Sequence, residues 1–225
     1  MSLIVMPGPE QIARHFRRAL LDCTRDEIPY THWNLLEVLP EALCQGIISL
    51  PIAPLLIDDC RGVRDVDNSL RTFFTPRLQA DFPVCAALAT ALQRPEVAKL
   101  AGETCGFEAD GSYLRVEYIQ DIDGAWLEPH HDVPQKLFSM VIYLCTGPDA
   151  AEWGTDIYDA DKRWFGRSSS AFNSAAIFIP GENTWHGFEK RKIRGIRRLM
   201  EINYVHPSWR DRDQLCFPDQ PIRLR

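Results

Sequence analysis

Glu128-Pro129-His130-His131-Asp132 is the stretch of this sequence that says most about its fold and its chemistry. In an extended strand, side chains two positions apart point to the same face, so His130 and Asp132 can bind one ion while His131 points away. A third candidate ligand, His186, follows within Trp185-His186-Gly187-Phe188. Two imidazoles and one carboxylate on one side of an octahedral ion would leave its other coordination positions open.

The sequence around these residues places them at the edge of a strand. A His-x-acid pair alone is weak, because a chain with six histidines and 31 acidic residues contains roughly one by chance. Here an alternating run over 113–119 precedes the pair and an apolar run over 138–144 follows it. The alternatives are a surface turn for His130 and Asp132 and a partly buried, hydrogen-bonded histidine for His186. The strand context favours a metal site, and this ligand set is typical of non-haem Fe(II) oxygenases.

The middle of the chain also carries an ordered set of motifs. They are Tyr118, His130-x-Asp132, Tyr143, Trp153-Gly154-Thr155, Phe178-Ile179-Pro180, His186 and Gly195-x-Arg197. Over roughly residues 112–205, this order resembles the prolyl-hydroxylase-like branch of the 2-oxoglutarate and Fe(II) dependent dioxygenases. The resemblance implies a mainly β protein with flanking helices, whose core is a double-stranded β-helix, or jelly roll. In such a fold two sheets pack face to face around a pocket.

The resemblance further implies a reaction and roles for the site residues. His130, Asp132 and His186 would hold Fe(II), which with 2-oxoglutarate as cosubstrate and dioxygen hydroxylates a substrate and releases succinate and CO2. Tyr118 and Tyr143 match tyrosines that line the cosubstrate pocket of similar enzymes, although ordinary sheet packing is the other interpretation. Because a carboxylate fills the third ligand position, hydroxylation is favoured over halogenation.

Two neighbouring arginines compete to bind the cosubstrate. The distal carboxylate of 2-oxoglutarate needs a cation, and a guanidinium matches it with two parallel hydrogen bonds. On a strand over 196–205 the two arginines have different companions: Arg197 shares a face with Leu199, Glu201 and Asn203, and Arg198 with Met200, Ile202 and Tyr204. The more polar face suits a cofactor pocket, and the Gly-x-Arg pattern also falls on Arg197, which is therefore preferred. Leu199 stands where the family often has a serine, which removes one expected hydroxyl contact.

The rest of the chain predicts one domain with a helical N-terminal region. Apolar residues at helical spacing predict an amphipathic helix over 9–24, and further helices are expected over 40–48, 83–92 and 95–103. We expect a single domain over 1–225, with a mainly helical bracing region over 1–107, a jelly-roll core over 108–205 and a tail over 206–225. The pattern does not predict the conformation of the tail.

Composition and charge exclude several classes of protein. Hydrophobic content of 45% and charged content of 25% are ordinary for a soluble chain, and no apolar run approaches a membrane span. A net charge of -6 without an extended basic face disfavours nucleic-acid partners. The apolar start lacks a basic leading region, so no signal peptide is expected. Seven cysteines without a C-x-x-C pair fit reduced thiols in a cytoplasmic protein.

The substrate is expected to be a small molecule or a peptidyl group. The basic cluster over 190–194 is by default a solvated hairpin tip, and its functional alternative is a cationic rim that draws an anionic substrate toward the iron. The pocket rim is expected from loops at 106–112, 121–127 and 152–170. A competing interpretation is a cupin-like metal-binding module without oxygenase activity, or the same fold with zinc or nickel in place of iron. The arginine beyond the distal histidine favours the oxygenase.

Overall fold

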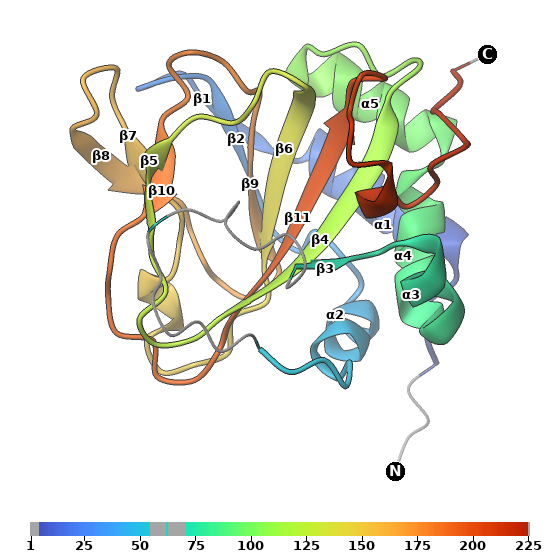
Figure 1. Cartoon of the computed structure of the whole chain (residues 1–225), viewed down its shortest axis with the longest axis horizontal. Coiled ribbons are helices and arrows are strands. Elements are labelled where there is room, and N and C mark those ends of the chain that lie inside the picture. The colour runs from blue at the N-terminus through green and yellow to red at the C-terminus, as the bar shows by residue number, and fades with distance from the viewer. Residues whose placement is uncertain (1–4, 55–61, 63–70, 225) are drawn as a thin grey trace.

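Two antiparallel sheets dominate the computed structural model, which describes residues 5–54, 62 and 71–224 (Figure 1). The larger sheet has the strand order β1 (Thr24–Asp26), β2 (His32–Leu35), β9 (Ser174–Phe178), β6 (Lys136–Tyr143), β11 (Arg197–Val205), β4 (Tyr113–Asp121) and β3 (Thr72–Phe73). The smaller sheet has the order β5 (Leu127–His130), β10 (His186–Phe188), β7 (Asp156–Tyr158) and β8 (Trp164–Arg167). This is the mainly β architecture with flanking helices that the sequence predicts.

The long strands at the middle of the larger sheet divide the molecule into two sides. β11 pairs with β4 along its whole length, from Arg197 opposite Asp121 to Val205 opposite Tyr113, and on its other edge it pairs with β6. One face of β11 belongs to the main hydrophobic core, through Met200, Ile202 and Tyr204. The other face looks toward the smaller sheet and carries Arg197, Leu199 and Glu201. The predicted strands over 113–119, 138–144 and 196–205 are confirmed, with shifts of up to two residues at their ends.

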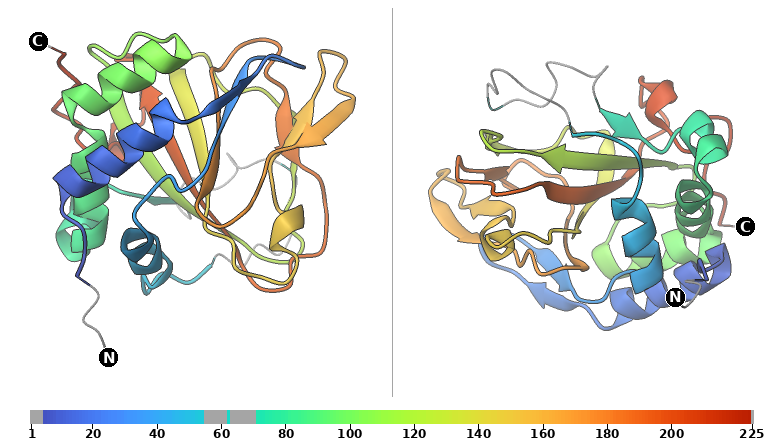
Figure 2. Two further views of the ribbon diagram at one scale, coloured as in Figure 1. Left: turned by 180° about the vertical axis from the view of Figure 1, so that it is seen from behind. Right: turned by 90° about the horizontal axis from the view of Figure 1, so that it is seen from below.

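Helices cover the face of the larger sheet that lies away from the smaller one (Figures 1 and 2). α1 (Pro9–Leu21), α4 (Pro83–Leu92) and α5 (Pro95–Cys105) pack against one another there, and each begins at a proline, whose missing N–H is not needed in a first turn. α5 ends at Gly106, which takes the left-handed conformation with φ of 81°. The helix predicted over 83–92 is confirmed, and the one over 95–103 extends to Cys105.

The N-terminal region contributes strands as well as helices, which the sequence interpretation missed. The helix expected over 9–24 ends at Leu21, because Thr24–Asp26 forms the edge strand β1. β2 and β3 also come from this region. The helix expected over 40–48 is confirmed as α2 (Glu41–Ile48), and α3 (Pro76–Asp81) is a helix that the sequence pattern did not predict. The region therefore extends both edges of the larger sheet in addition to covering its face.

The C-terminal segment after β11 follows the start of β4. Leu215 forms a β-bridge with Arg115, and the N–H of Cys216 donates to the carbonyl of Leu114 at 3.0 Å. Further on, the N–H of Ile222 donates to the carbonyl of Ser112 at 2.8 Å. Since Leu215, Cys216 and Ile222 are all buried, this segment is part of the folded domain.

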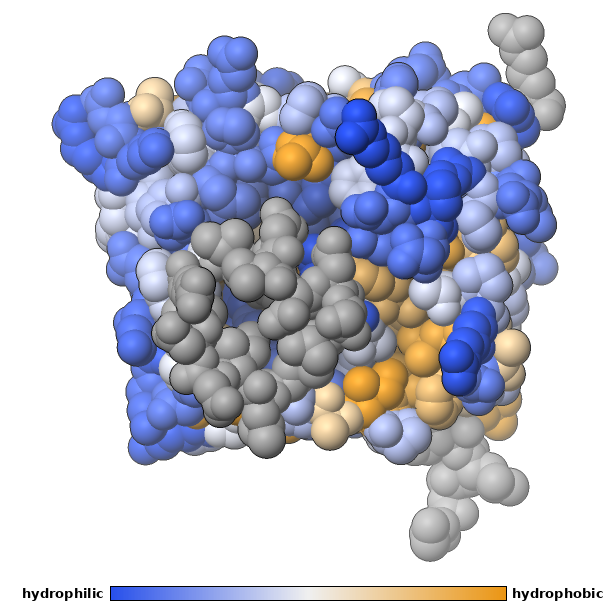
Figure 3. Space-filling view, viewed as in Figure 1, coloured by the Kyte–Doolittle hydropathy of each residue, from blue (hydrophilic) through white to orange (hydrophobic). Residues whose placement is uncertain are grey.

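The described surface in the view of Figure 3 is mainly hydrophilic, with hydrophobic side chains gathered between the regions of α2 and α3. Within the described residues, no helix combines the length and the apolar character needed to cross a bilayer.

Candidate metal centre

Two of the three candidate ligands face each other across a strand pair. His130 on β5 lies opposite His186 on β10, and their ring centroids are 4.4 Å apart. In each ring Nδ1 lies 2.9 Å from the backbone carbonyl two residues earlier, that of Glu128 and that of Thr184. Because a carbonyl oxygen can only accept, each Nδ1 carries a proton, and in the neutral form of either ring the lone pair is on Nε2. Backbone contacts of this kind fix the orientation of metal-binding histidines.

A glycine lets these two strands approach. A Cβ atom on Gly187, directly after His186, would lie 2.8 Å from the carbonyl oxygen of Leu127 and 3.1 Å from that of Glu128. Backbone atoms cannot move aside as the end of a flexible side chain can. We conclude that Gly187 is required for β10 to pair with β5 closely enough to bring the two imidazoles together.

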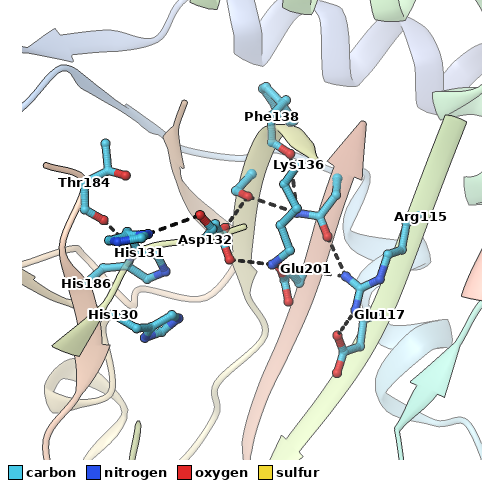
Figure 4. Close-up of polar contacts among 12 residues, drawn as sticks. Arg115, Glu117, His130, His131, Asp132, Lys136, Phe138, Thr184, His186 and Glu201 are labelled. Carbon is cyan, nitrogen blue, oxygen red and sulfur yellow. Dashed lines mark hydrogen bonds and ion pairs between the residues drawn. The ribbon is translucent and has the colours of Figure 1, made fainter. Parts of the chain in front are cut away.

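The third ligand lies beyond the end of β5, in the loop that leads to β6. Asp132 is buried, and both oxygens of its carboxylate accept hydrogen bonds at 2.6 Å, Oδ1 from Nζ of Lys136 and Oδ2 from Oγ of Ser139. One ligand atom each from His130, Asp132 and His186 lies within 4.8 Å of the other two. Figure 4 shows the three side chains converging on one region, His130 and His186 from the smaller sheet and Asp132 from the loop after β5. The predicted triad is thus assembled, and its donor set suits a divalent transition metal.

Burial and charge set the protonation states that such a site needs. Burial, reinforced by the nearby His130, lowers the pKa of His186 to about 4, so this imidazole is neutral at physiological pH. Burial alone would raise the pKa of Asp132, but the Lys136 ammonium outweighs it and lowers that pKa. The pKa of the Lys136 ammonium is raised, because Asp132 and Glu201 outweigh its own desolvation. A neutral imidazole and an ionised carboxylate are the forms that bind metal ions.

His131 lies beside this group without joining it. Its ring packs edge-on against Trp185 with centroids 4.8 Å apart, and its Nδ1 lies 3.4 Å from the backbone oxygen of Asp132. The metal-ligand group of the described residues does not include His131, but His131 lines the same cavity as His130 and Asp132, so the expectation that it points to the other face stays a prediction.

The ligands lie in the wall of a cavity of about 700 Å³ between the two sheets. The larger sheet contributes Arg115, Lys136, Arg197, Leu199 and Glu201 to its lining, and the smaller sheet contributes Leu127, Glu128, His130, His186 and Phe188. The segment 208–211 after β11 lines it as well. Of the three loops expected to form the rim, residues 106–112, 121–127 and 152–170, the described lining includes only Leu127 and Thr155, so most of that prediction is wrong.

Arg197 lines this cavity, whereas Arg198 is not among its described lining residues. The buried guanidinium of Arg197 lies over the ring of Phe188, 3.8 Å from the centroid. Its Nε donates to the carbonyl of Trp153 at 2.7 Å and its Nη1 to Asp121 at 2.5 Å. Among the described residues, Nη2 has no hydrogen-bond partner. The arginine is therefore held firmly, with one amino group left for a ligand.

The two tyrosines lie on opposite sides of the larger sheet. Tyr143 is on the cavity side, and its hydroxyl lies 2.6 Å from the hydroxyls of both Thr155 and Ser168. Tyr118 belongs to the helix-covered core, with its hydroxyl beside Arg198, and it does not line the cavity. The sequence indicates this placement, because Tyr118 lies at even-numbered spacing from Leu114 and Val116 on β4 and therefore shares their helix-covered face.

The basic cluster after β10 is engaged in local ion pairs. Lys192 pairs with Asp123 at 2.6 Å and Arg194 with Asp149 at 2.5 Å, and Arg191 pairs with the buried Asp156. These side chains line a separate groove that contains none of the three candidate ligands. They give no support to a cationic rim at the metal centre.

The site contains charged groups that the sequence interpretation left out. Lys136 bridges Asp132 and Glu201, and Arg115 lies 3.8 Å from Glu201 and 2.8 Å from Glu117. Nothing in the local pattern marks Lys136. Glu201 could have been assigned to the cavity because it shares the face of Arg197.

Comparison with known proteins identifies the fold. No protein-family model and no curated protein sequence matches the chain. Among solved structures it is similar to a prolyl-4-hydroxylase from Pseudomonas putida, with a TM-score of 0.54 and 12% identity over 85% of this chain and 98% of that one. A prolyl 4-hydroxylase from Phytophthora capsici gives a TM-score of 0.61 and 8% identity over 92% of this chain and 68% of that one. A prolyl hydroxylase from Trichoplax adhaerens, solved with a hypoxia inducible factor peptide fragment, gives a TM-score of 0.56 and 8% identity over 88% of this chain and 90% of that one.

These similarities, together with the two sheets, establish the class of fold. The fold is a jelly roll of two sheets, as the sequence predicts, and it is similar to the fold of these solved prolyl hydroxylases.

Proposed function

We propose that this protein is an Fe(II) and 2-oxoglutarate dependent dioxygenase that hydroxylates a small-molecule or peptidyl substrate. The observation that carries the proposal is the convergence of His130, Asp132 and His186 in a cavity that also holds a buried arginine. A fold alone does not define a function, so the proposal rests on this site.

The three ligands suit a ferrous ion. His130, Asp132 and His186 would hold the ion with two imidazoles and one carboxylate, the ligand set of non-haem Fe(II) oxygenases. When bound, iron and 2-oxoglutarate would supply the oxidising chemistry, with succinate and CO2 as by-products. The backbone carbonyls behind His130 and His186 fix the two rings, so the protein contributes a preformed ligand geometry.

Arg197 is the residue that we assign to the distal carboxylate of 2-oxoglutarate. Its position over Phe188 and its bonds to Trp153 and Asp121 hold the guanidinium still, and Nη2 can donate to a carboxylate in the cavity. Tyr143 would support the floor of this subsite through Thr155, which lines the cavity. We do not carry Tyr118 into the proposal, because it lies on the other side of the sheet.

The substrate would enter over the part of the cavity that the arginine does not occupy. Residues 131–133, 135–136 and 208–211 line the cavity, and they come from segments outside the smaller sheet. A peptidyl substrate is supported by the peptide complex of the Trichoplax prolyl hydroxylase, which concerns that protein. We also infer a cytoplasmic location, because the six described cysteines are free and five are buried.

The alternative is a metal-binding module without oxygenase activity. One observation favours it: the ion pair of Arg197 with Asp121 already uses part of the guanidinium. Zinc or nickel could also occupy the ligands, because affinity alone does not select iron.

The test is the turnover of 2-oxoglutarate. With Fe(II), ascorbate and dioxygen, the protein should release succinate slowly even without its substrate, and His130→Ala should not. Binding of 2-oxoglutarate is measured in parallel under anaerobic conditions with Fe(II). Absence of both succinate release and 2-oxoglutarate binding would refute the oxygenase and leave the metal-binding module.

A further inference from the structure

The three candidate ligands are held by different parts of the molecule. His130 and His186 belong to the smaller sheet, where the β5 and β10 backbones fix them. Asp132 lies in the loop after β5, and the groups that hold its carboxylate come from the larger sheet. Figure 4 shows Lys136 and Glu201 on the side of Asp132 opposite His130 and His186. The position of the third ligand therefore depends on contacts between the sheets.

The first support is the ammonium of Lys136, at the start of β6. Its Nζ donates at 2.6 Å to Oδ1 of Asp132 and at 2.6 Å to Oε1 of Glu201 on β11. The three side chains are only 8–11% exposed, so none of these charges can be satisfied by bulk water. Arg115, 3.8 Å from Glu201, continues the alternation of charge across the sheet. Lys136 thus ties the loop carboxylate to a fixed anion on a central strand.

The second support is the hydroxyl of Ser139, three residues after Lys136 on β6. Its Oγ donates to Oδ2 of Asp132 at 2.6 Å and accepts from Nδ2 of Asn203 at 3.0 Å. A hydroxyl has one hydrogen to donate, and the amide of Asn203 occupies an acceptor position. The Ser139 hydrogen is therefore directed at the Asp132 carboxylate.

The geometry points to Lys136 and Ser139 as positioning residues for the metal ion. They hold the Asp132 carboxylate toward the two histidines before an ion arrives, so that binding needs no ordering of the loop. This inference rests on the proposed function, because it takes the three residues as the ligands. Charge alone predicts the opposite effect for Lys136, since an ammonium next to the site repels a divalent cation. The direction in which metal affinity changes on removal of Lys136 separates the two effects.

The first experiment uses Ser139→Ala, which removes only a hydroxyl. Co(II) affinity is measured by titration calorimetry, and the visible absorption of bound Co(II) reports its coordination geometry. We expect roughly 10-fold weaker binding and an altered spectrum, because loss of one outer partner of a ligand typically weakens metal binding by 10- to 100-fold. Ser170→Ala is the matched control: Ser170 is equally buried, but its hydroxyl donates to the backbone of Ala150. Its affinity should stay within about twofold of the wild type, because no ligand contact changes.

The second experiment removes the ammonium while also neutralising Glu201, so that Asp132 is the one carboxylate of the bridge that loses its partner. Lys136→Met is made together with Glu201→Gln and compared with Glu201→Gln alone. We expect the double variant to bind Co(II) roughly 10- to 100-fold more weakly than the single one. Lys192→Met is the control, since Lys192 makes an ion pair of the same 2.6 Å length on the surface. Thermal unfolding of each metal-free variant checks that the fold is retained.

The outcomes distinguish this inference from the proposed function. If the wild type binds no Co(II), the metal centre and the proposed function fail together with it. If the wild type binds Co(II) and both Ser139→Ala and the Lys136 variant bind it equally tightly or more tightly, the positioning role alone is refuted. A fall in unfolding temperature with unchanged affinity and spectrum would also refute it, because a purely structural role predicts that result.

Discussion

Replacement of Arg197 by lysine tests the cosubstrate subsite. Arg197→Lys keeps the positive charge but loses three contacts of the guanidinium: the bond to the Trp153 carbonyl, the stacking over Phe188 and the amino group left for a ligand. The new ammonium would remain with Asp121, which now takes Nη1. Loss of one charge-assisted hydrogen bond amounts to about 1.5–3 kcal/mol, or roughly a 10- to 150-fold rise in the Kd for 2-oxoglutarate. The carbonyl of Trp153, left without a donor, should lower the free energy of unfolding by about 1–3 kcal/mol.

The assay for Arg197→Lys is anaerobic titration of 2-oxoglutarate into protein loaded with Fe(II), with chemical unfolding measured separately. Arg198→Lys is the control from the same strand, because Arg198 lies beside Tyr118 on the helix side of the sheet. We expect its affinity for 2-oxoglutarate to be unchanged within about twofold, because no contact in the cavity is lost. A large loss in Arg198→Lys with none in Arg197→Lys would show that the distal carboxylate binds elsewhere.

Three further predictions concern the metal centre and the fold. His130→Ala and His186→Ala should each abolish Fe(II) binding and activity, whereas His131→Ala should retain Fe(II) binding; equal loss in His131→Ala would overturn the ligand assignment. The pKa of His186 falls from 6.5 to about 4 on folding, so the unfolded chain binds the proton more readily than the folded one. The metal-free protein should therefore lose up to about 3 kcal/mol of its free energy of unfolding as the pH falls from about 6.5 to 4. In His186→Ala, the free energy of unfolding measured by denaturant titration should depend less on pH over this range. The side-chain amide of Asn173 accepts from the N–H of Leu39 and donates to its carbonyl, and the backbone of Asn173 has a φ of 62°. Asn173→Ala should lower the free energy of unfolding by about 2–4 kcal/mol, and Asn173→Gly by less because glycine adopts this φ without strain. Both effects are measured as shifts in the denaturant midpoint.

The sequence predicts the parts of this protein in which local pattern and final structure agree. β4 and β11 have nine residues each, long enough for alternation along the strand to define two faces. His130 and Asp132 are only two residues apart, so local strand geometry is enough to bring them together. His186 is 56 positions beyond His130 in the numbering, and here the order of motifs, not the local pattern, predicts the pairing.

The parts that the sequence does not predict depend on short elements and distant contacts. β1, β2 and β3 have two to four residues each, too few for periodicity to appear. Charged residues are usually expected at the surface. The sequence pattern therefore does not reveal that Lys136 and Glu201 form an ion pair inside the protein. The docking of the C-terminal segment depends on contacts such as that between Arg115 and Gln214, 99 positions apart.

The support of the three ligands by two different sheets has a consequence for local unfolding. The strands of the smaller sheet are only three or four residues long, so few backbone hydrogen bonds hold them, and their amides should exchange with solvent before those of β4 and β11. An ion bound by His130, His186 and Asp132 would link β5 and β10 to a carboxylate anchored on the larger sheet. Opening of the smaller sheet would then require release of the ion, so each tenfold increase in free metal concentration above its Kd should slow exchange there about tenfold. The same ion that supplies the chemistry would thus determine how often the wall of the cavity opens.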